Sequence, residues 1–237
     1  LDALDGAKRV AGHSEVKLAG IQRPADHRLR GSSVWISTIM ARDTAPPESQ
    51  AGGPPAPERE PGALEYACRS GRFVVTAELS PLDSADPQDL LRRATPFRGR
   101  VDAVNVTDGA GANCHMSSLA ASALLAADGY EPVFQIACRD RNRIAMQADM
   151  LGAAALGVRN LLAVTGDGVG NGDHPDARPV FDLDSVSLLR VARDLRDQGR
   201  YASGRSVSAR PGLFLGATIN PFAPPFGERI ANLEKKL

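Results

Sequence analysis

The residue best suited to acid–base chemistry is a glutamate near the end of a strand-like segment. Glu78 lies in residues 73–79 (FVVTAEL), whose other members are mostly apolar or β-branched. An unpaired carboxyl beside apolar residues is costly to ionise, so its pKa rises toward a value useful for general acid catalysis. The alternative is a glutamate that merely meets solvent at the strand end. We favour the catalytic interpretation.

A second candidate is the sequence Thr165-Gly166-Asp167, which directly follows the apolar residues 160–164. Glycine lets a ligand approach the backbone closely, and Asp167 offers a hydrogen-bond acceptor. A plain turn at a strand end uses the same residue types. Spacing alone leaves both interpretations open.

Charged residues crowd a third position, residues 138–142 (CRDRN), between a predicted strand and a predicted helix. Asp140 is expected to cap the helix. Arg139 and Arg141 could each hold a phosphate or pair with Asp140, and the sequence leaves this open.

Metal chemistry is not expected. Cys114 and His115 are adjacent and Cys138 is distant, which makes a poor tetrahedral ligand set. Cys68 is the third cysteine, and three are too few for a disulfide framework.

Alternating strands and helices must position these candidates. The predicted strands are residues 73–79, 102–108, 132–137, 160–164 and 213–220. The predicted helices are residues 89–95, 117–128, 141–156, a segment capped by Asp184 or Ser185, and residues 229–237. Strands that are apolar on both faces and alternate with helices indicate a parallel sheet covered by helices.

The helix at residues 141–156 has a definite predicted geometry. Ile144, Ala148, Leu151 and Ala155 have helical spacing and are expected to form its buried face. Gly157 stands where a glycine ends a helix.

The fold class follows from these elements and from two absent motifs. Neither GxGxxG nor GxxxxGK[ST] occurs after a strand. Polar residues gather where strands end, and in a (β/α)₈ barrel that end forms the active-site face. The five units in residues 63–237 predict an α/β fold. A complete barrel needs eight units, so the expectation of a partial TIM (β/α)₈ barrel rests on the family resemblance given below.

Residues 1–62 lack sustained periodicity, and we expect them to form a disordered, low-complexity N-terminal segment. Residues 44–62 contain six prolines and three glycines, which predicts a disordered segment. Residues 34–36 (VWI) form one apolar patch, either a short strand or a buried anchor. The first methionine is Met40, so a natural start there is an open alternative.

Composition excludes several partners. Lys plus Arg and Asp plus Glu both number 28, so the chain lacks the positive excess that nucleic acid or an anionic membrane attracts. No apolar segment reaches the roughly 18 residues of a membrane span. We expect a cytoplasmic protein without nucleic-acid or membrane partners.

Six segments in order resemble the methylenetetrahydrofolate reductase family, in its bacterial form. They are residues 76–81 (TAELSP), 104–108 (VNVTD), 134–142 (FQIACRDRN), 160–167 (NLLAVTGD), 179–185 (PVFDLDS) and 216–221 (GATINP). The resemblance runs from about residue 73 to residue 237 and does not cover residues 1–62.

This resemblance implies a flavin-dependent (β/α)₈ barrel that reduces 5,10-methylenetetrahydrofolate to 5-methyltetrahydrofolate in one-carbon metabolism. It implies FAD rather than FMN, with NADH or NADPH as electron donor. Glu78 falls on the family's catalytic general acid, which opens the folate imidazolidine ring. Asp167 falls on a second site aspartate, near the flavin and the pterin.

The resemblance also implies a set of flavin contacts with some departures from the family pattern. These residues are Thr107, Gln135, Thr165, Gly166, Asp167, Asn220, Asn232 and Lys236. Gln135 stands where many members have His, Thr165 where some have Arg, and Asn220 near a tyrosine position. Arg229 replaces a family aspartate one turn before Asn232.

The family pattern continues beyond the fifth unit, so we expect the chain to be a fragment of a full enzyme that forms a homo-oligomer. Whether the five units alone are active stays open. A different class remains possible at this stage, a pterin- or corrinoid-pathway barrel, such as a methyltransferase-associated binding subunit, without its own hydride chemistry.

Overall fold

The computed structural model describes residues 60–219, 225 and 227–236. The predictions for residues 1–59, including the apolar patch at residues 34–36, lie outside this range, as does Asn220.

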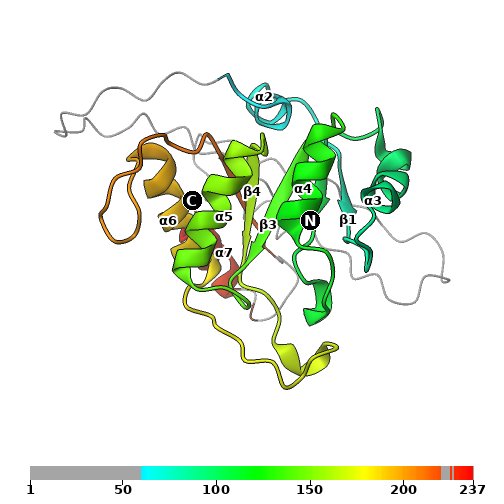
Figure 1. Cartoon of the computed structure of the whole chain (residues 1–237). Coiled ribbons are helices and arrows are strands. Elements are labelled where there is room, and N and C mark those ends of the chain that lie inside the picture. Colours follow the sequence, from blue (N-terminus) through cyan, green and yellow to red (C-terminus); the bar gives the residue numbers. More distant parts are fainter. Residues whose placement is uncertain (1–59, 220–224, 226, 237) are drawn as a thin grey trace.

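Five parallel strands form one sheet (Figure 1). They are β1 (Thr76–Leu79), β2 (Ala103–Val106), β3 (Pro132–Ala137), β4 (Asn160–Val164) and β5 (Phe214–Ala217). Their spatial order is their sequence order, β1-β2-β3-β4-β5. The bounds of β3 and β4 are as predicted, whereas β1, β2 and β5 are shorter than predicted.

Helices connect the strands. They are α3 (Pro87–Ala94), α4 (Ser118–Ala127), α5 (Arg143–Ala155) and α6 (Ser185–Asp197), with α7 (Gly227–Glu234) after β5. Short 3-10 turns occur at η1 (Thr95–Phe97), η2 (Ala110–Ala112) and η3 (Val169–Asn171).

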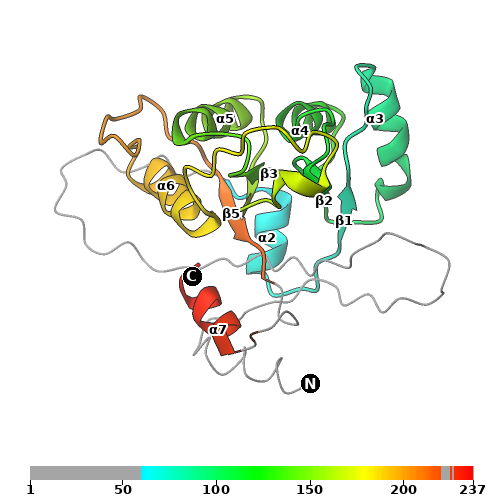
Figure 2. The same cartoon turned by 90° about the horizontal axis from the view of Figure 1, so that it is seen from below.

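The arrangement distinguishes a barrel-type sheet from a doubly wound one. Figure 2 shows α3, α4, α5 and α6 along one side of the sheet, with α2 on the other. A doubly wound sheet reverses its strand order and carries helices on both faces. The α/β prediction is confirmed, and the sequential parallel order is consistent with a partial (β/α)₈ barrel.

The two faces of the sheet bury different cores. On the outer face, β3 and β4 contribute Phe134, Ile136 and Leu161 to a core shared with α5 and α6. A second outer cluster packs Leu79 and Val106 with α3 and α4. We call the opposite side, to which the alternate strand residues point, the inner face.

Helix α2 (Ala63–Arg69), which the sequence did not predict, covers the amino-terminal end of the inner face. Its Leu64 packs in a cluster with Val133 and Leu162. Glu131 tethers it, because one carboxylate oxygen accepts from the Leu64 N–H at 3.4 Å and from the Asn160 amide at 2.9 Å. Seven residues after a Pro/Gly-rich stretch give little periodic signal, so only packing identifies this helix.

The predicted buried face of α5 is wrong. Its buried residues include Met146, Met150 and Ala153, while Ile144 is 75% exposed. The helix is rich in alanine, so more than one face satisfies the apolar spacing. The positive φ of Gly157 at the helix end agrees with the prediction.

The N-cap of α5 is Asn142, not Asp140. The Asn142 side-chain oxygen accepts from the N–H groups of Ile144 and Ala145, both at 3.1 Å. Asp140 is instead engaged by Arg139. Asp184 caps α6, one of the two residues predicted for that position.

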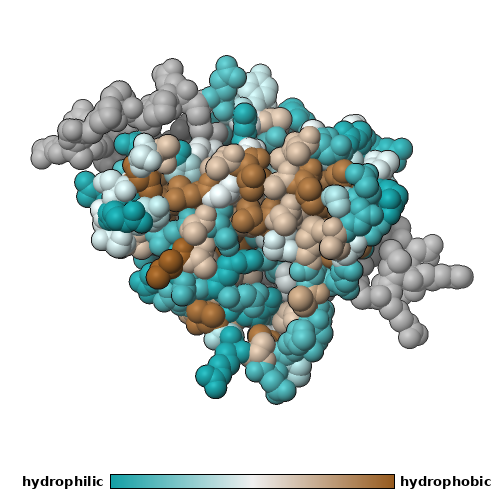
Figure 3. Space-filling view, viewed as in Figure 1, coloured by the Kyte–Doolittle hydropathy of each residue, from teal (hydrophilic) through white to brown (hydrophobic). Residues whose placement is uncertain are grey.

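Figure 3 shows brown and pale-brown surface over α4 and α5, the two alanine-rich helices.

Candidate functional site

Polar residues gather on the inner face at the carboxyl-terminal half of the strands. Leu79, Val106 and Phe134 pack in the outer cores, so the alternate residues Glu78, Asn105, Thr107 and Gln135 belong to the inner face. Glu78 and Asn105 are register partners on β1 and β2. Two predicted cofactor residues, Thr107 and Gln135, thus lie on the same face as the predicted general acid.

Two polar atoms of this group are buried without a hydrogen bond. Asn105 and Thr107 are each 5% exposed, and Asn105 Oδ1 and Thr107 Oγ1 have no partner among the residues that the structure describes. Buried polar groups are nearly always satisfied, so each exception needs an explanation. Ser122 Oγ and Asn160 Oδ1, the other two such atoms, belong to α4 and to the first residue of β4. Asn105 on β2 and Thr107 directly after it thus place two unsatisfied polar atoms at the strand next to that of Glu78.

Asn105 is a site residue that the sequence analysis did not single out. A signal was present, because Asn105 and Thr107 follow Ala103 at strand spacing between buried valines. A polar pair at every second residue of a buried strand indicates a polar inner face.

The carboxyl of Glu78 has the electrostatic character expected of a general acid. The side chain is exposed on the open inner face. Desolvation by the surrounding protein atoms nevertheless raises its pKa above the ordinary value of 4.5. The sequence-based expectation of a raised pKa is confirmed.

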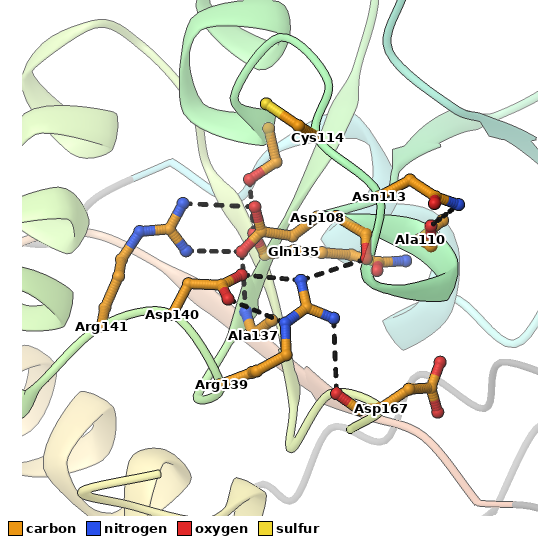
Figure 4. A network of polar contacts seen from close by, with 12 residues as sticks. Asp108, Ala110, Asn113, Cys114, Gln135, Ala137, Arg139, Asp140, Arg141 and Asp167 are labelled. Carbon is orange, nitrogen blue, oxygen red and sulfur yellow. Dashed lines mark hydrogen bonds and ion pairs between the residues drawn. The ribbon is translucent and has the colours of Figure 1, made fainter. Parts of the chain in front are cut away.

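Arg139 organises the loops at the carboxyl edge of the sheet (Figure 4). The residue is 4% exposed, and its guanidinium binds both carboxylate oxygens of Asp140 at 2.7 Å. It also donates to the Gly109 carbonyl at 3.2 Å and to the Asp167 carbonyl at 3.5 Å. The arginine left open by the sequence therefore pairs with Asp140 and reaches the loops after β2 and β4.

A neighbouring ion pair fixes the end of β2. Asp108 accepts from the Ala137 N–H at 2.8 Å and from Arg141 at 2.5 Å. Arg141 also contacts Asp149 at 3.0 Å. Arg141 is thus committed to carboxylates of the protein, and this pairing holds β2, β3 and α5 together.

The loop between β4 and α6 carries three predicted residues. The Thr165 hydroxyl accepts from the Ser185 N–H at 3.1 Å, so it supports the start of α6. Thr165 also lines an open hollow of about 540 Å³ with Phe181 and Arg190. Asp167 is exposed, and Figure 4 shows its carboxylate directed away from Arg139.

Gly166 has a structural requirement of its own. Its φ is +89°, and a Cβ there would lie 3.1 Å from the Arg139 Cβ. The glycine thus permits close packing of the loop after β4 on Arg139, two residues after β3. The expected approach of a cofactor to its backbone stays a prediction.

The residues predicted on the last helix lie after β5. Lys236 Nζ donates to the Thr218 carbonyl at 2.8 Å, and burial lowers the Lys236 pKa. Asn232 is half-buried on α7.

Neither cysteine nearest the site supports a metal centre. Cys114 is exposed, and burial raises the pKa of Cys138 to about 12. Over residues 60–219, 225 and 227–236, no group of three or more His, Cys, Asp or Glu side chains could hold a metal ion. In the same part of the chain, no helix is long and apolar enough to cross a membrane.

Comparison with known protein families gives the decisive observation. The family model described as methylenetetrahydrofolate reductase matches residues 63–213, more than half of the chain. The chain belongs to the methylenetetrahydrofolate reductase family. A comparison with curated proteins finds no match.

Membership of the methylenetetrahydrofolate reductase family supports folate-related reduction and an oxidoreductase activity in general. The matched region begins at the first residue of α2 and ends just before β5. It therefore contains Glu78, the unsatisfied residues Asn105 and Thr107, and the Arg139 network.

Proposed function

We propose that this protein reduces 5,10-methylenetetrahydrofolate to 5-methyltetrahydrofolate with FAD as its cofactor and NADH or NADPH as electron donor. The observation that carries the proposal is the position of Glu78. Its carboxyl has a raised pKa, and its register partner Asn105 is one of two buried residues with unsatisfied polar atoms. Family membership supplies the substrate class.

Glu78 acts as the general acid. A carboxyl whose pKa is raised holds a proton at higher pH than an ordinary glutamate. Delivered to a nitrogen of the imidazolidine ring, that proton opens the ring and leaves an electrophilic iminium carbon. Reduced flavin, when bound, supplies the hydride for this carbon.

The inner face provides the complementary binding groups. Asn105 Oδ1 and Thr107 Oγ1 are free to bond a ligand, and Gln135 adds an amide on the adjacent strand. A pterin and an isoalloxazine both carry amide-like edges that such groups recognise. The unsatisfied atoms therefore fit a planar, hydrogen-bonding ligand better than an apolar one.

Asp167 contributes a carboxylate at the end of β4. Asp167 follows β4, which lies three strands along the sheet from β1, the strand of Glu78. In this proposal the two carboxyls therefore serve different parts of the bound ligands. Asp167 lies near the flavin and the pterin in this proposal, and Thr165, Gly166, Asn220, Asn232 and Lys236 complete the cofactor contacts.

The test is Glu78→Gln, which keeps the size of the side chain and removes its acidity. We expect flavin binding and flavin reduction by the donor to stay unchanged, because neither step needs this proton. Folate reduction should fall on the order of 10²- to 10⁴-fold. Stopped-flow absorbance near 450 nm measures each half-reaction.

Glu60→Gln is the matched control, since Glu60 is exposed and lies outside the sheet. Equal rates of folate reduction in wild type and Glu78→Gln would remove Glu78 from the mechanism. A purified protein that binds a folate but no flavin would support the alternative class, a barrel without its own hydride chemistry.

We also propose that the full-length protein is a cytoplasmic homo-oligomer that binds neither nucleic acid nor membrane. The balanced charge supports the last two statements. Light scattering on the purified full-length protein measures the oligomeric state, and a monomer at micromolar concentration would contradict the proposed homo-oligomer.

A further inference from the structure

We infer that Arg139 is a positioning residue, which sets the place of Asp167 relative to the end of β2 by holding the loops on both sides of β3. The inference rests on the proposed function, because it concerns the site in which Asp167 takes part.

The first support is the set of hydrogen bonds that the Arg139 guanidinium donates. Arg139 is 4% exposed, and Asp140 balances its charge through two bonds of 2.7 Å. The remaining donors point sideways, to the Gly109 carbonyl on the β2 side and the Asp167 carbonyl on the β4 side. One planar fork therefore joins segments that are 58 residues apart in the chain.

The second support is that Arg139 holds both ends of the loop after β4. Its guanidinium reaches the Asp167 carbonyl at the start of the loop. Its own carbonyl accepts from the Val180 N–H at 2.7 Å, close to the start of α6. Both ends of the segment at residues 167–180 are thus hydrogen-bonded to Arg139, which follows β3.

The third support is the shape around the side chain. A Cβ on Gly109, whose φ is +56°, would overlap Arg139 Nη2. A Cβ on Gly166 would press on the Arg139 Cβ at 3.1 Å. Two glycines on opposite sides leave room for this one side chain.

The same two loops also contact each other beyond Arg139. Both carboxylate oxygens of Asp173 accept from the Cys114 N–H, at 3.1 and 3.0 Å. A Cβ on Gly172 would overlap the Ala112 carbonyl. Arg139 therefore controls the end nearest the sheet, where Asp167 lies, and not the outer end.

Loss of the guanidinium has a predictable consequence. The carbonyls of Gly109 and Asp167 each lose a donor, and a cavity opens between the loops. Asp167 then loses its fixed place beside the ligand. A displacement near 1 Å in an active site can cost about 10²-fold in rate.

The experiment compares Arg139→Met with Arg143→Met in the purified full protein. Arg143 is the matched control, since it binds Asp182 on the same loop through two side-chain bonds of 2.8 Å but is exposed and far from Asp167 in the loop. We expect Arg139→Met to lower kcat for folate reduction about 100-fold. Arg143→Met should change kcat less than about threefold.

A double-mutant cycle with Asp167→Asn separates positioning from general damage. If Arg139 acts through Asp167, the double variant should be no less active than Asp167→Asn alone. Multiplying losses in the double variant would overturn the inference. Circular dichroism and thermal melts establish that each variant is folded.

Gly109→Ala provides a second route if Arg139→Met does not fold. The added methyl displaces the guanidinium while Arg139 itself remains, so the same loss of kcat is expected. Wild-type kcat in a folded Gly109→Ala variant would overturn the inference.

The failure of this inference differs from failure of the proposed function. If the wild type binds FAD and reduces the folate while Arg139→Met matches it, only the positioning role is wrong. If the wild type binds no flavin and reduces no folate, both proposals are wrong.

Discussion

Glu78 combines solvent access with a raised pKa, a combination that suits a group that must exchange protons between turnovers. Access lets the carboxyl be reprotonated from water. The surrounding protein atoms favour its neutral form, which is the form that can donate.

We expect the rate of folate reduction to depend on the protonated fraction of Glu78. Because the pKa is above 4.5, the rate should fall as the pH rises through that higher value. Flavin reduction by the donor should lack this dependence. Single-turnover rates of both half-reactions across pH 4 to 9 provide the measurement. A pH profile of folate reduction that is unchanged in Glu78→Gln would contradict the assignment.

The same raised pKa predicts a cost in stability. The folded state binds the Glu78 proton more tightly than the unfolded state, so its stability is highest below the unfolded pKa of 4.5 and falls as the pH rises through the folded pKa. Glu78→Gln should therefore melt at a slightly higher temperature than wild type at pH 7. Below pH 4 the difference should vanish, which thermal melts at the two pH values can establish.

At the scale of single elements, α5 depends on the residue that begins it. Asn142 satisfies two N–H groups of the first turn, and Asp140 satisfies none of those described. Asp140 and Asn142 are only two positions apart, yet Asn142 caps a helix and Asp140 neutralises Arg139.

Asn142→Ala should lower the free energy of unfolding by about 1 kcal/mol, the usual value of an N-cap. Asn142→Asp should retain most of the stability, since its carboxylate can accept the same bonds. Urea denaturation followed by circular dichroism measures both. A larger loss in Asn142→Asp than in Asn142→Ala would show that the cap does not operate as described.

At the scale of the whole molecule, α2 closes the amino-terminal end of the inner face. Leu64 is fully buried in a cluster with residues from β2, β3, β4 and β5. The helix therefore joins four strands that otherwise contact mainly their neighbours.

Leu64→Ala should destabilise the protein by about 2–5 kcal/mol, the range for leucine in a packed core. Tyr66→Ala on the same helix is the control, because Tyr66 is 65% exposed and should change stability by less than about 0.5 kcal/mol. Equal losses for the two variants in chemical denaturation would mean that α2 does not pack as described.

Deleting residues 1–59 should leave the melting temperature within a few degrees of that of the intact protein, because this segment lacks the apolar periodicity needed to join a core. Extending the deletion through residue 72 should lower it clearly, since α2 is then lost. A large fall for the shorter deletion would show that residues 1–59 pack on the barrel.

The sequence by itself determined the five parallel strands, the alternating helices and the polar strand ends. Continuous apolar segments mark β3 and β4 without ambiguity, because such strands are buried on both faces. The resemblance to the family, carried by Glu78 and by six segments in order, was also evident from the sequence alone, and the family match agrees with it.

Only the tertiary structure decided how side chains pair. The alanine-rich α5 could bury more than one face, and its contacts with β3 and β4 selected Met146 and Met150. The partners of Arg139 lie on loops about 30 residues away on either side. Such contacts depend on which strands are neighbours and on how their loops fold over the edge of the sheet. The spacing of residues along the sequence specifies neither the strand neighbours nor the loop paths. The unsatisfied atoms of Asn105 and Thr107 emerge for the same reason, since burial is a property of the assembled sheet.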